Sequence, residues 1–204
     1  MKVLSFLGLL LFVSMYLIIS NDPLPYFDKK TAEILFQYHS TFFDQLFIIV
    51  TYLNNVESVL IISIIVSIYL INKKRFKALL FYLFTIVTAT ISTYFFKIYI
   101  MRNRPDNGLL DINSYAFPSW HATLSVVLSL LVFIIFNEYI KNSRVKKFFI
   151  SFIFIWPLLI GFSRVYLNVH WLSDVLAGWG LGLFIVSTST LFFKYFNENS
   201  TIKF

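Results

Sequence analysis

We predict an all-α membrane protein, a six-transmembrane-helix bundle with a short interfacial helix between the first two spans. Apolar residues make up 58% of the 204 residues and charged residues only 13%, and the mean hydropathy is +0.77. This charged share is about half that of a soluble domain, which argues against both a water-soluble globule and a disordered chain. The chain also contains no cysteine, which excludes disulfides and thiolate sites.

Six uncharged apolar stretches are the predicted spans. They cover Val3–Asn21, Ser58–Asn72, Ala78–Phe96, Ala122–Asn137, Phe148–Ser163 and Val175–Phe193. A helix needs about 20 residues to cross the hydrocarbon core. The third and sixth reach this length, and the others do so with flanking polar residues such as Asn54, Asn55 and Glu57. Runs such as residues 61–66 do not alternate with period two, as the strands of a membrane barrel would.

The first stretch is expected to be a retained span within a single domain of residues 1–204. A secretory signal peptide is the alternative, because Lys2 precedes the apolar run. The run continues to about Ser20, however, and Asn21–Asp22–Pro23 follows it without a small-residue cleavage pattern.

The segment Thr31–Tyr52 is expected to form the interfacial helix. Apolar residues at 34, 35, 38, 42, 46 and 49 are interspersed with polar ones such as Glu33 and Asp44. This pattern favours a helix on the membrane surface. A connecting helix packed against the bundle is the alternative. His39 lies in this segment without an evident charged partner, and we expect it to be structural or interfacial.

The basic residues predict the orientation in the membrane. Eleven of the 17 fall on one side of the predicted spans: Lys2, Lys73, Lys74, Arg75, Lys77, Lys141, Arg144, Lys146, Lys147, Lys194 and Lys203. Positive charge favours the cytoplasmic side. We therefore expect a multi-pass protein of the cell membrane with both termini in the cytoplasm. The basic excess is accounted for by topology, so we expect no nucleic-acid partner.

Ionisable residues gather on the opposite, outer side. They are Lys97, Arg102, Arg104, Asp106, His121, Arg164, His170 and Asp174. Ionisable groups near or inside spans are costly and are candidates for function. A single residue of this kind does not require a function, since Lys97 can snorkel to the interface and an arginine can contact lipid headgroups.

These residues occur in an ordered pattern. Lys97 is followed after six residues by Arg104–Pro105, then come Pro118–Ser119–Trp120–His121, and then Ser163–Arg164, His170 and Asp174. The set resembles the signature of the membrane-embedded type 2 phosphatidic acid phosphatase family, which reads Lys-x6-Arg-Pro, Pro-Ser-Gly-His and Ser-Arg-x5-His-x3-Asp. Ten of the eleven specified positions match. With six spans and the motifs at their outer ends, the resemblance covers nearly the whole chain.

The resemblance implies a lipid phosphatase that forms a phosphohistidine intermediate on His170. Compact bacterial relatives act on phosphatidylglycerophosphate, undecaprenyl pyrophosphate, phosphatidate or lipid A. The departure from the family is Trp120, which stands where glycine is usual. Its ring must line the path of the lipid or narrow the pocket, so it bears on substrate preference.

The residue types fit phosphoryl transfer, which depends on positioning and on electrostatic stabilisation. Lys97, Arg104 and Arg164 provide three cations for the phosphate oxygens. Ser119 and the backbone N–H groups around Trp120 add neutral donors. Two histidines and an aspartate also suggest a metal site, but three nearby cations would oppose a bound metal ion. We therefore expect no metal and no cofactor.

His170 and Asp174 are four residues apart, one turn of a helix, so the carboxylate can accept a hydrogen bond from one ring nitrogen. The other nitrogen is then a nucleophile. A buried polar pair that ties helices together is the structural alternative. His121 is left to protonate the departing oxygen and later to activate water.

The expected function is therefore hydrolysis of a lipid phosphomonoester or pyrophosphate, with the lipid phosphate and the bilayer as partners. One alternative is a lipid phosphotransferase, which passes the phosphate to a lipid or sugar acceptor after the same first half-reaction. A transporter or lipid-binding protein that keeps the fold is the non-enzymatic alternative. Nothing in the sequence indicates an oligomeric state.

Overall fold

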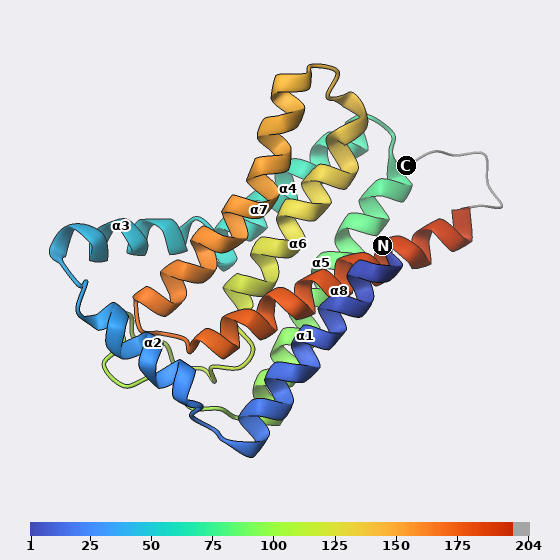
Figure 1. The fold of residues 1–204 in the computed structure, drawn as a ribbon. Helices are drawn as coiled ribbons and strands as arrows, with labels where there is room; N and C mark the ends of the chain where they lie inside the picture. Colours follow the sequence, from blue (N-terminus) through green and yellow to red (C-terminus); the bar gives the residue numbers. More distant parts are fainter. Residues whose placement is uncertain (198–204) are drawn as a thin grey trace.

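The computed structural model describes residues 1–197, and every regular element in this range is helical (Figure 1). The helices are α1 (Lys2–Asn21), α2 (Tyr26–Phe36), α3 (Thr41–Tyr52), α4 (Val56–Asn72), α5 (Phe76–Ile100), α6 (Trp120–Phe136), the short η1 (Asn137–Tyr139), α7 (Ser143–Tyr166) and α8 (Leu172–Asn197). The predicted all-α class is confirmed. Lys203, one of the eleven basic residues, and the last residues of the expected 1–204 domain lie outside the described residues.

Four of the six predicted spans correspond to helices long and apolar enough to cross a membrane. These are α1, α5, α7 and α8. The second predicted span, α4, has 17 residues and meets this description only together with α3, from which it is bent by 41°. The fourth, α6, is apolar but also has only 17 residues. The described residues therefore contain four candidate spans, or five with the bent pair, and the count of six is not confirmed.

Polar side chains define several helix starts. Ser40, Asn55 and Asn142 accept hydrogen bonds from backbone N–H groups in the first turns of α3, α4 and α7. Such caps satisfy donors that have no partner within the helix. At the other end of α5, Met101 adopts the left-handed conformation (φ 51°), and the loop that carries Arg102 and Arg104 begins there.

Glycines in α8 allow close packing with two other helices. A Cβ on Gly178 would lie 2.6 Å from the backbone oxygen of Ser119, and one on Gly182 would lie 2.7 Å from that of Thr123, both associated with α6. A Cβ on Gly180 would lie 2.8 Å from the backbone oxygen of Gly8 in α1. Small residues of this kind let membrane helices approach at backbone distance. As a result, the backbones of α6 and α1 pack closely against α8.

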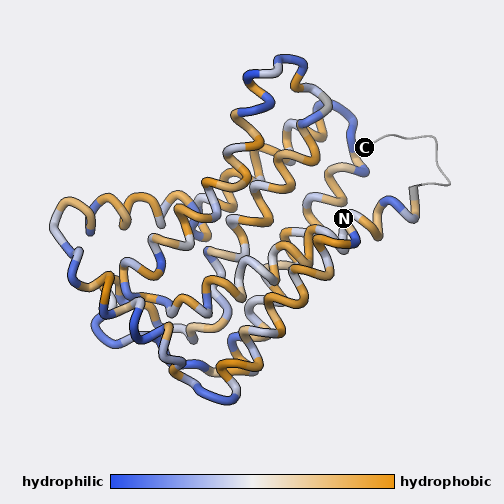
Figure 2. The backbone as a smooth tube through the Cα atoms, viewed as in Figure 1, coloured by the Kyte–Doolittle hydropathy of each residue, from blue (hydrophilic) through white to orange (hydrophobic). Residues whose placement is uncertain are grey.

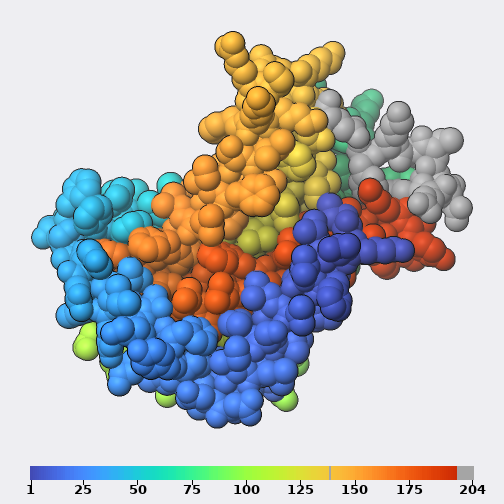
Figure 3. Space-filling view, viewed as in Figure 1, coloured from blue at the N-terminus to red at the C-terminus, as the bar shows by residue number. Residues whose placement is uncertain are grey.

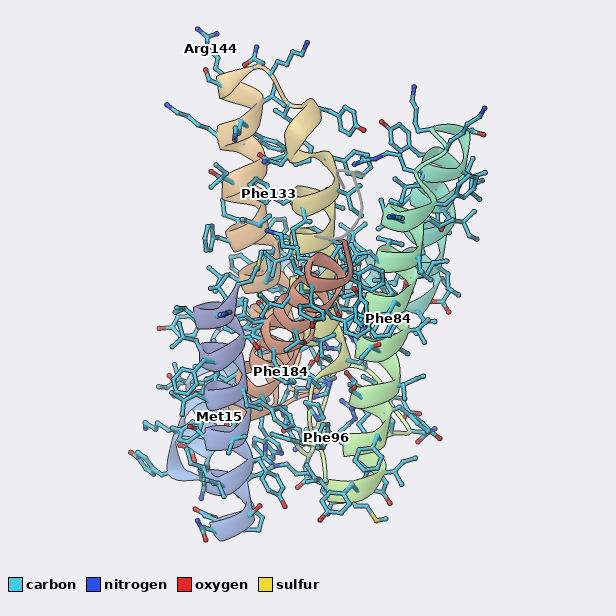
Figure 4. All side chains as sticks on the ribbon, turned by 90° about the vertical axis from the view of Figure 1, so that its right-hand side faces the viewer. Met15, Phe84, Phe96, Phe133, Arg144 and Phe184 are labelled. Atoms are coloured by element: carbon cyan, nitrogen blue, oxygen red, sulfur yellow. The ribbon has the colours of Figure 1, made fainter. Side chains whose placement is uncertain are left out.

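The bundle has two polar ends separated by an apolar middle (Figure 2). The α6–α7 connection lies at the top of Figure 1, whereas the C-terminal ends of α1 and α5 lie at the bottom. In the view turned by 90°, Arg144 lies at the upper end and Phe96 near the lower end (Figure 4). The basic α6–α7 connection is therefore far from the end of α5, which carries Lys97.

The predicted interfacial helix is divided into two. The helix is interrupted between α2 and α3, although the chain is continuous. Together α1 to α3 cover the lower and left parts of the face in Figure 3. At the break, Nδ1 of His39 lies 2.9 Å from Oδ1 of Asp44, and its ring stacks on Tyr166 with centroids 4.6 Å apart. The expectation that His39 has no charged partner is wrong, because the turn brings Asp44 beside it. A membrane-surface position for this segment remains a prediction.

Candidate active site

Predicted site residues from five parts of the chain line one cavity of about 340 Å³. Its lining includes six of the eight predicted site residues: Lys97, Arg104, Trp120, His121, Arg164 and His170. They come from the end of α5, the loop before α6, the start of α6, the end of α7 and the loop before α8. Ser119 and Asp174 are buried behind the lining.

Lys97 and Arg104 are held by backbone oxygens of the loop before α6. Lys97 Nζ donates to the backbone oxygens of Tyr115 and Ala116, the latter at 3.3 Å. Arg104 Nε donates to the backbone oxygen of Ser114 at 2.6 Å, and Nη2 donates to its Oγ at 2.9 Å. Burial lowers the pKa of Arg104 to about 10, so the group stays charged at neutral pH. The loop thus fixes two positive charges at the cavity wall.

Arg164 provides the third cation and is 2% exposed. Its Nη1 donates to Oγ1 of Thr51 in α3 at 2.7 Å. Its Nε is buried and has no hydrogen-bond partner among the described residues. A buried guanidinium N–H without a partner is costly, and an anion in the cavity would satisfy it.

His170 lies between a cation and a carboxylate. Arg104 Nη1 is 3.0 Å from Nε2 of His170. A guanidinium can only donate, so Nε2 carries the lone pair and Nδ1 carries the proton. Nδ1 faces Oδ2 of Asp174 at 3.4 Å. Burial and the nearby charges of Arg104 and Lys97 lower the pKa of His170 well below its usual value, which keeps the ring neutral.

The predicted helical turn between His170 and Asp174 is wrong. Helix α8 begins at Leu172, so His170 lies in the preceding loop. The two side chains still face each other, but no hydrogen bond forms between them, and Nδ1 of His170 is buried without a partner among the described residues. The carboxylate of Asp174 instead accepts from Trp171 N at 2.9 Å and from Arg102 Nη1.

His121 and Trp120 form the start of α6 at the cavity wall. Their rings meet edge to face with centroids 5.3 Å apart. The Trp120 ring is partly buried against the main apolar core and forms part of the cavity wall, and whether it lines the path of the lipid or narrows the pocket stays a prediction. The backbone oxygen of His121 accepts from Asn54 Nδ2 at 3.0 Å, which ties α6 to the α3–α4 bend.

Ser119 caps α6. Its Oγ accepts from Ala122 N at 3.5 Å, and its own N–H donates to the backbone oxygen of Asp174 at 3.0 Å. The side chain is fully buried and does not line the cavity. In this arrangement Ser119 orients the N-terminus of α6, and its direct contact with phosphate remains a prediction.

Four residues without a predicted role contact the site. Arg102 was noted only as an outer ionisable group, and Asp28, Thr51 and Asn54 lie outside the sequence motifs. Arg102 donates hydrogen bonds to both Asp28 and Asp174. Thr51 accepts a hydrogen bond from Arg164, and Asn54 donates one to the backbone oxygen of His121. All four are buried.

The acidic residues and histidines of residues 1–197 include no group of three or more placed to hold a metal ion. Independence of a metal remains a prediction to be tested in solution.

Two histidines and three cations, of which Lys97 and Arg164 are buried, line one cavity of a helical membrane protein, and this combination defines a narrow class of candidates. Residues 78–198, more than half of the chain, match the PAP2 superfamily, and the chain belongs to it.

A curated relative agrees with this assignment. The chain is 35% identical over 91 residues to phosphatidylglycerophosphatase B of Bacillus subtilis (strain 168), a match that covers 44% of this chain and 45% of that protein. The match thus spans just under half the length of this curated relative.

Two crystal structures share the fold. The structure of a transmembrane PAP2 type phosphatidylglycerolphosphate phosphatase from Bacillus subtilis matches with a TM-score of 0.86 and 21% identity over 98% of both chains. Aquifex aeolicus LpxE matches with a TM-score of 0.63 and 18% identity, over 79% of this chain and 93% of its own.

Proposed function

We propose that this protein is a membrane lipid phosphatase that hydrolyses a lipid phosphomonoester or pyrophosphate. The observation that carries the proposal is the meeting of His170 and His121 with Lys97, Arg104 and Arg164 in one cavity. Membership of the PAP2 superfamily and the similarity to phosphatidylglycerophosphatase B support it. The candidate substrates are phosphatidylglycerophosphate, undecaprenyl pyrophosphate and phosphatidate.

The cavity wall favours a lipid over a soluble phosphate ester. From Lys97 toward the middle of α5, the wall continues through Tyr94 and Thr90. Val56 of α4 completes it. Tyr94 is 66% exposed and Val56 is 53% exposed, so the cavity borders the outer surface of the helices. In a bilayer this surface faces lipid, and a substrate can therefore keep its chains in the membrane while its phosphate reaches the cations.

The proposed reaction has two balanced steps. Nε2 of His170 attacks phosphorus, the bond from phosphorus to the leaving oxygen breaks, and His121 gives that oxygen a proton. Water then attacks the phosphohistidine and gives a proton to His121, and the P–N bond breaks to release phosphate. Lys97, Arg104 and Arg164 balance the charge on the transferred oxygens in both steps.

The site is proposed to face the extracytoplasmic side, with both termini in the cytoplasm. The proposal rests on the basic residues of the α4–α5 and α6–α7 connections, which lie at the opposite end of the bundle from the end of α5 that carries Lys97.

Phosphate release from a panel of the three candidate lipids, with and without a chelator, tests the proposal. The purified protein should release phosphate without an acceptor and with chelator present, and His170→Ala should release none. Loss of the lipid's phosphate only when a lipid or sugar acceptor is present, with the phosphate recovered on that acceptor, would favour the phosphotransferase. No release under either condition would contradict the proposal.

A further inference from the structure

A buried ion-pair chain links α2 to Asp174. Arg102 is 7% exposed, and Asp28 and Asp174 are exposed by 1% and 0%. Nη2 of Arg102 is 2.8 Å from Oδ2 of Asp28, and its Nη1 donates to Oδ1 of Asp174. One guanidinium therefore connects two carboxylates that are 146 positions apart in the sequence (174 − 28).

The same chain completes the start of α8. Because α8 begins at Leu172, Trp171 occupies the position before the helix and has no side-chain oxygen to cap it. Asp28 takes over this function from another helix, since its Oδ1 accepts from Ser173 N at 2.8 Å. Asp174 reaches back to Trp171 N at 2.9 Å, the reciprocal half of a capping box. The loop with His170 is thereby joined to a fixed helix start.

The orientation of the Asp174 carboxylate depends on both contacts. Oδ1 is held by Arg102 and Oδ2 by Trp171 N, and Oδ2 is also the atom that faces His170 Nδ1 at 3.4 Å. A buried carboxylate that loses its cation is left uncompensated and must neutralise or move. Either change alters the partner that Nδ1 of His170 faces.

We propose that Asp28 and Arg102 are positioning residues, which act on His170 through Asp174. Arg102 orients and balances the Asp174 carboxylate, and Asp28 holds Arg102 and the first turn of α8. The positioning role rests on the proposed function. The effect of Asp28 and Arg102 on the surroundings of the His170 ring does not depend on it. A purely structural role, in which the pair only anchors α2, is the competing hypothesis.

A double-mutant comparison separates the two roles. The readout is the burst of nitrophenol from an aryl phosphate, which reports attack by His170. Arg102→Met should lower the burst rate about tenfold or more with little change in KM, and Arg102→Lys should restore part of it. In an Asp174→Asn background the same Arg102→Met change should cost less than about threefold, because the residue through which it acts is already altered.

Asp28→Asn gives an independent version of the test, since it removes one charge and preserves the size of the side chain. It should lower the burst in the wild-type background and lose most of its effect beside Asp174→Asn. Arg144→Met and Glu33→Gln are matched controls, because both side chains are exposed and neither lines the cavity. Neither variant should change the burst. Equal losses in both backgrounds would overturn the positioning role.

A second readout does not require turnover. The chain has three histidines, so the Nδ1 proton of His170 can be assigned in nitrogen-15-labelled protein by comparison with the His39→Gln and His121→Gln variants. Asp28→Asn and Arg102→Met should each move this resonance upfield, and Arg144→Met should not. An unmoved resonance would overturn the proposal even if the wild-type protein hydrolyses phosphate, whereas a moved resonance with no hydrolysis would contradict only the proposed function.

Discussion

The proton donated to the leaving group gives a prediction that separates the two histidines. His121 lines the same cavity as His170, and Asn54 holds its backbone oxygen at 3.0 Å. Loss of a general acid costs about 10²–10⁴-fold in rate. In His121→Ala, Lys97 and Arg164 remain at the wall and still balance part of the leaving charge. We therefore expect the lower end for a lipid phosphate, about 100-fold, or about 2.7 kcal/mol in the barrier.

A nitrophenolate needs no proton to depart, so the same variant should lose less than about fivefold with an aryl phosphate. The observable is the rapid-quench burst of nitrophenol or of lipid alcohol, measured before hydrolysis of the phosphohistidine limits the rate. His170→Ala should abolish both bursts, because every substrate must meet the nucleophile. His39→Gln, which changes a histidine outside the cavity, should alter neither.

Equal burst defects for the two substrates in His121→Ala would refute this reasoning. His121 would then bind phosphate or shape the wall instead of donating a proton, and Trp120→Gly would test whether the neighbouring ring restricts the loop.

Three further predictions address other parts of the molecule. Thr51→Val keeps the shape of the side chain but removes the hydroxyl that accepts from Arg164. The affinity for inorganic phosphate, measured as its inhibition constant, should weaken about three- to tenfold, and an unchanged constant would contradict the role of Thr51. Burial and nearby cations lower the pKa of His170, so its neutral form should persist below pH 6.5. In a pH profile of the burst rate, the loss of activity on the acid side should therefore occur below pH 6.5, and a loss at or above that pH would contradict the expectation. A tag at Asn142 should be accessible only from the cytoplasm and one at Asn107 only from outside, and labelling of both from the same side would contradict the predicted topology.

Much of the helical content and the cavity lining could be predicted, because both depend on local patterns. Apolar length identifies α1, α5, α7 and α8, and the motif spacing identifies the residues around the cavity. The helices α4 and α6 are harder to classify. Each has 17 residues, and α6 is buried among its neighbours, so its apolar composition reflects packing inside the bundle as well as contact with lipid.

The network behind the cavity could not be predicted, because it depends on contacts between residues distant in sequence. Asp28 and Arg102 are 74 positions apart, and Thr51 and Arg164 are 113 apart. The spacing of four between His170 and Asp174 also indicated a helical turn where the structure has a helix start. The spacing does bring the two side chains face to face. Because α8 begins only at Leu172, however, Asp174 accepts from Trp171 N and Arg102 instead of from His170.

The most direct test of the account is the identification of a phosphohistidine on His170. The protein is mixed with a lipid phosphate labelled with phosphorus-32, quenched in alkali after milliseconds to seconds, digested and mapped. The account predicts an alkali-stable, acid-labile label on the peptide that contains His170. The label should be absent in His170→Ala and longer-lived in His121→Ala, which lacks the group that activates water. Turnover by the wild-type protein with no label on His170, or with label on another residue, would contradict the central claim.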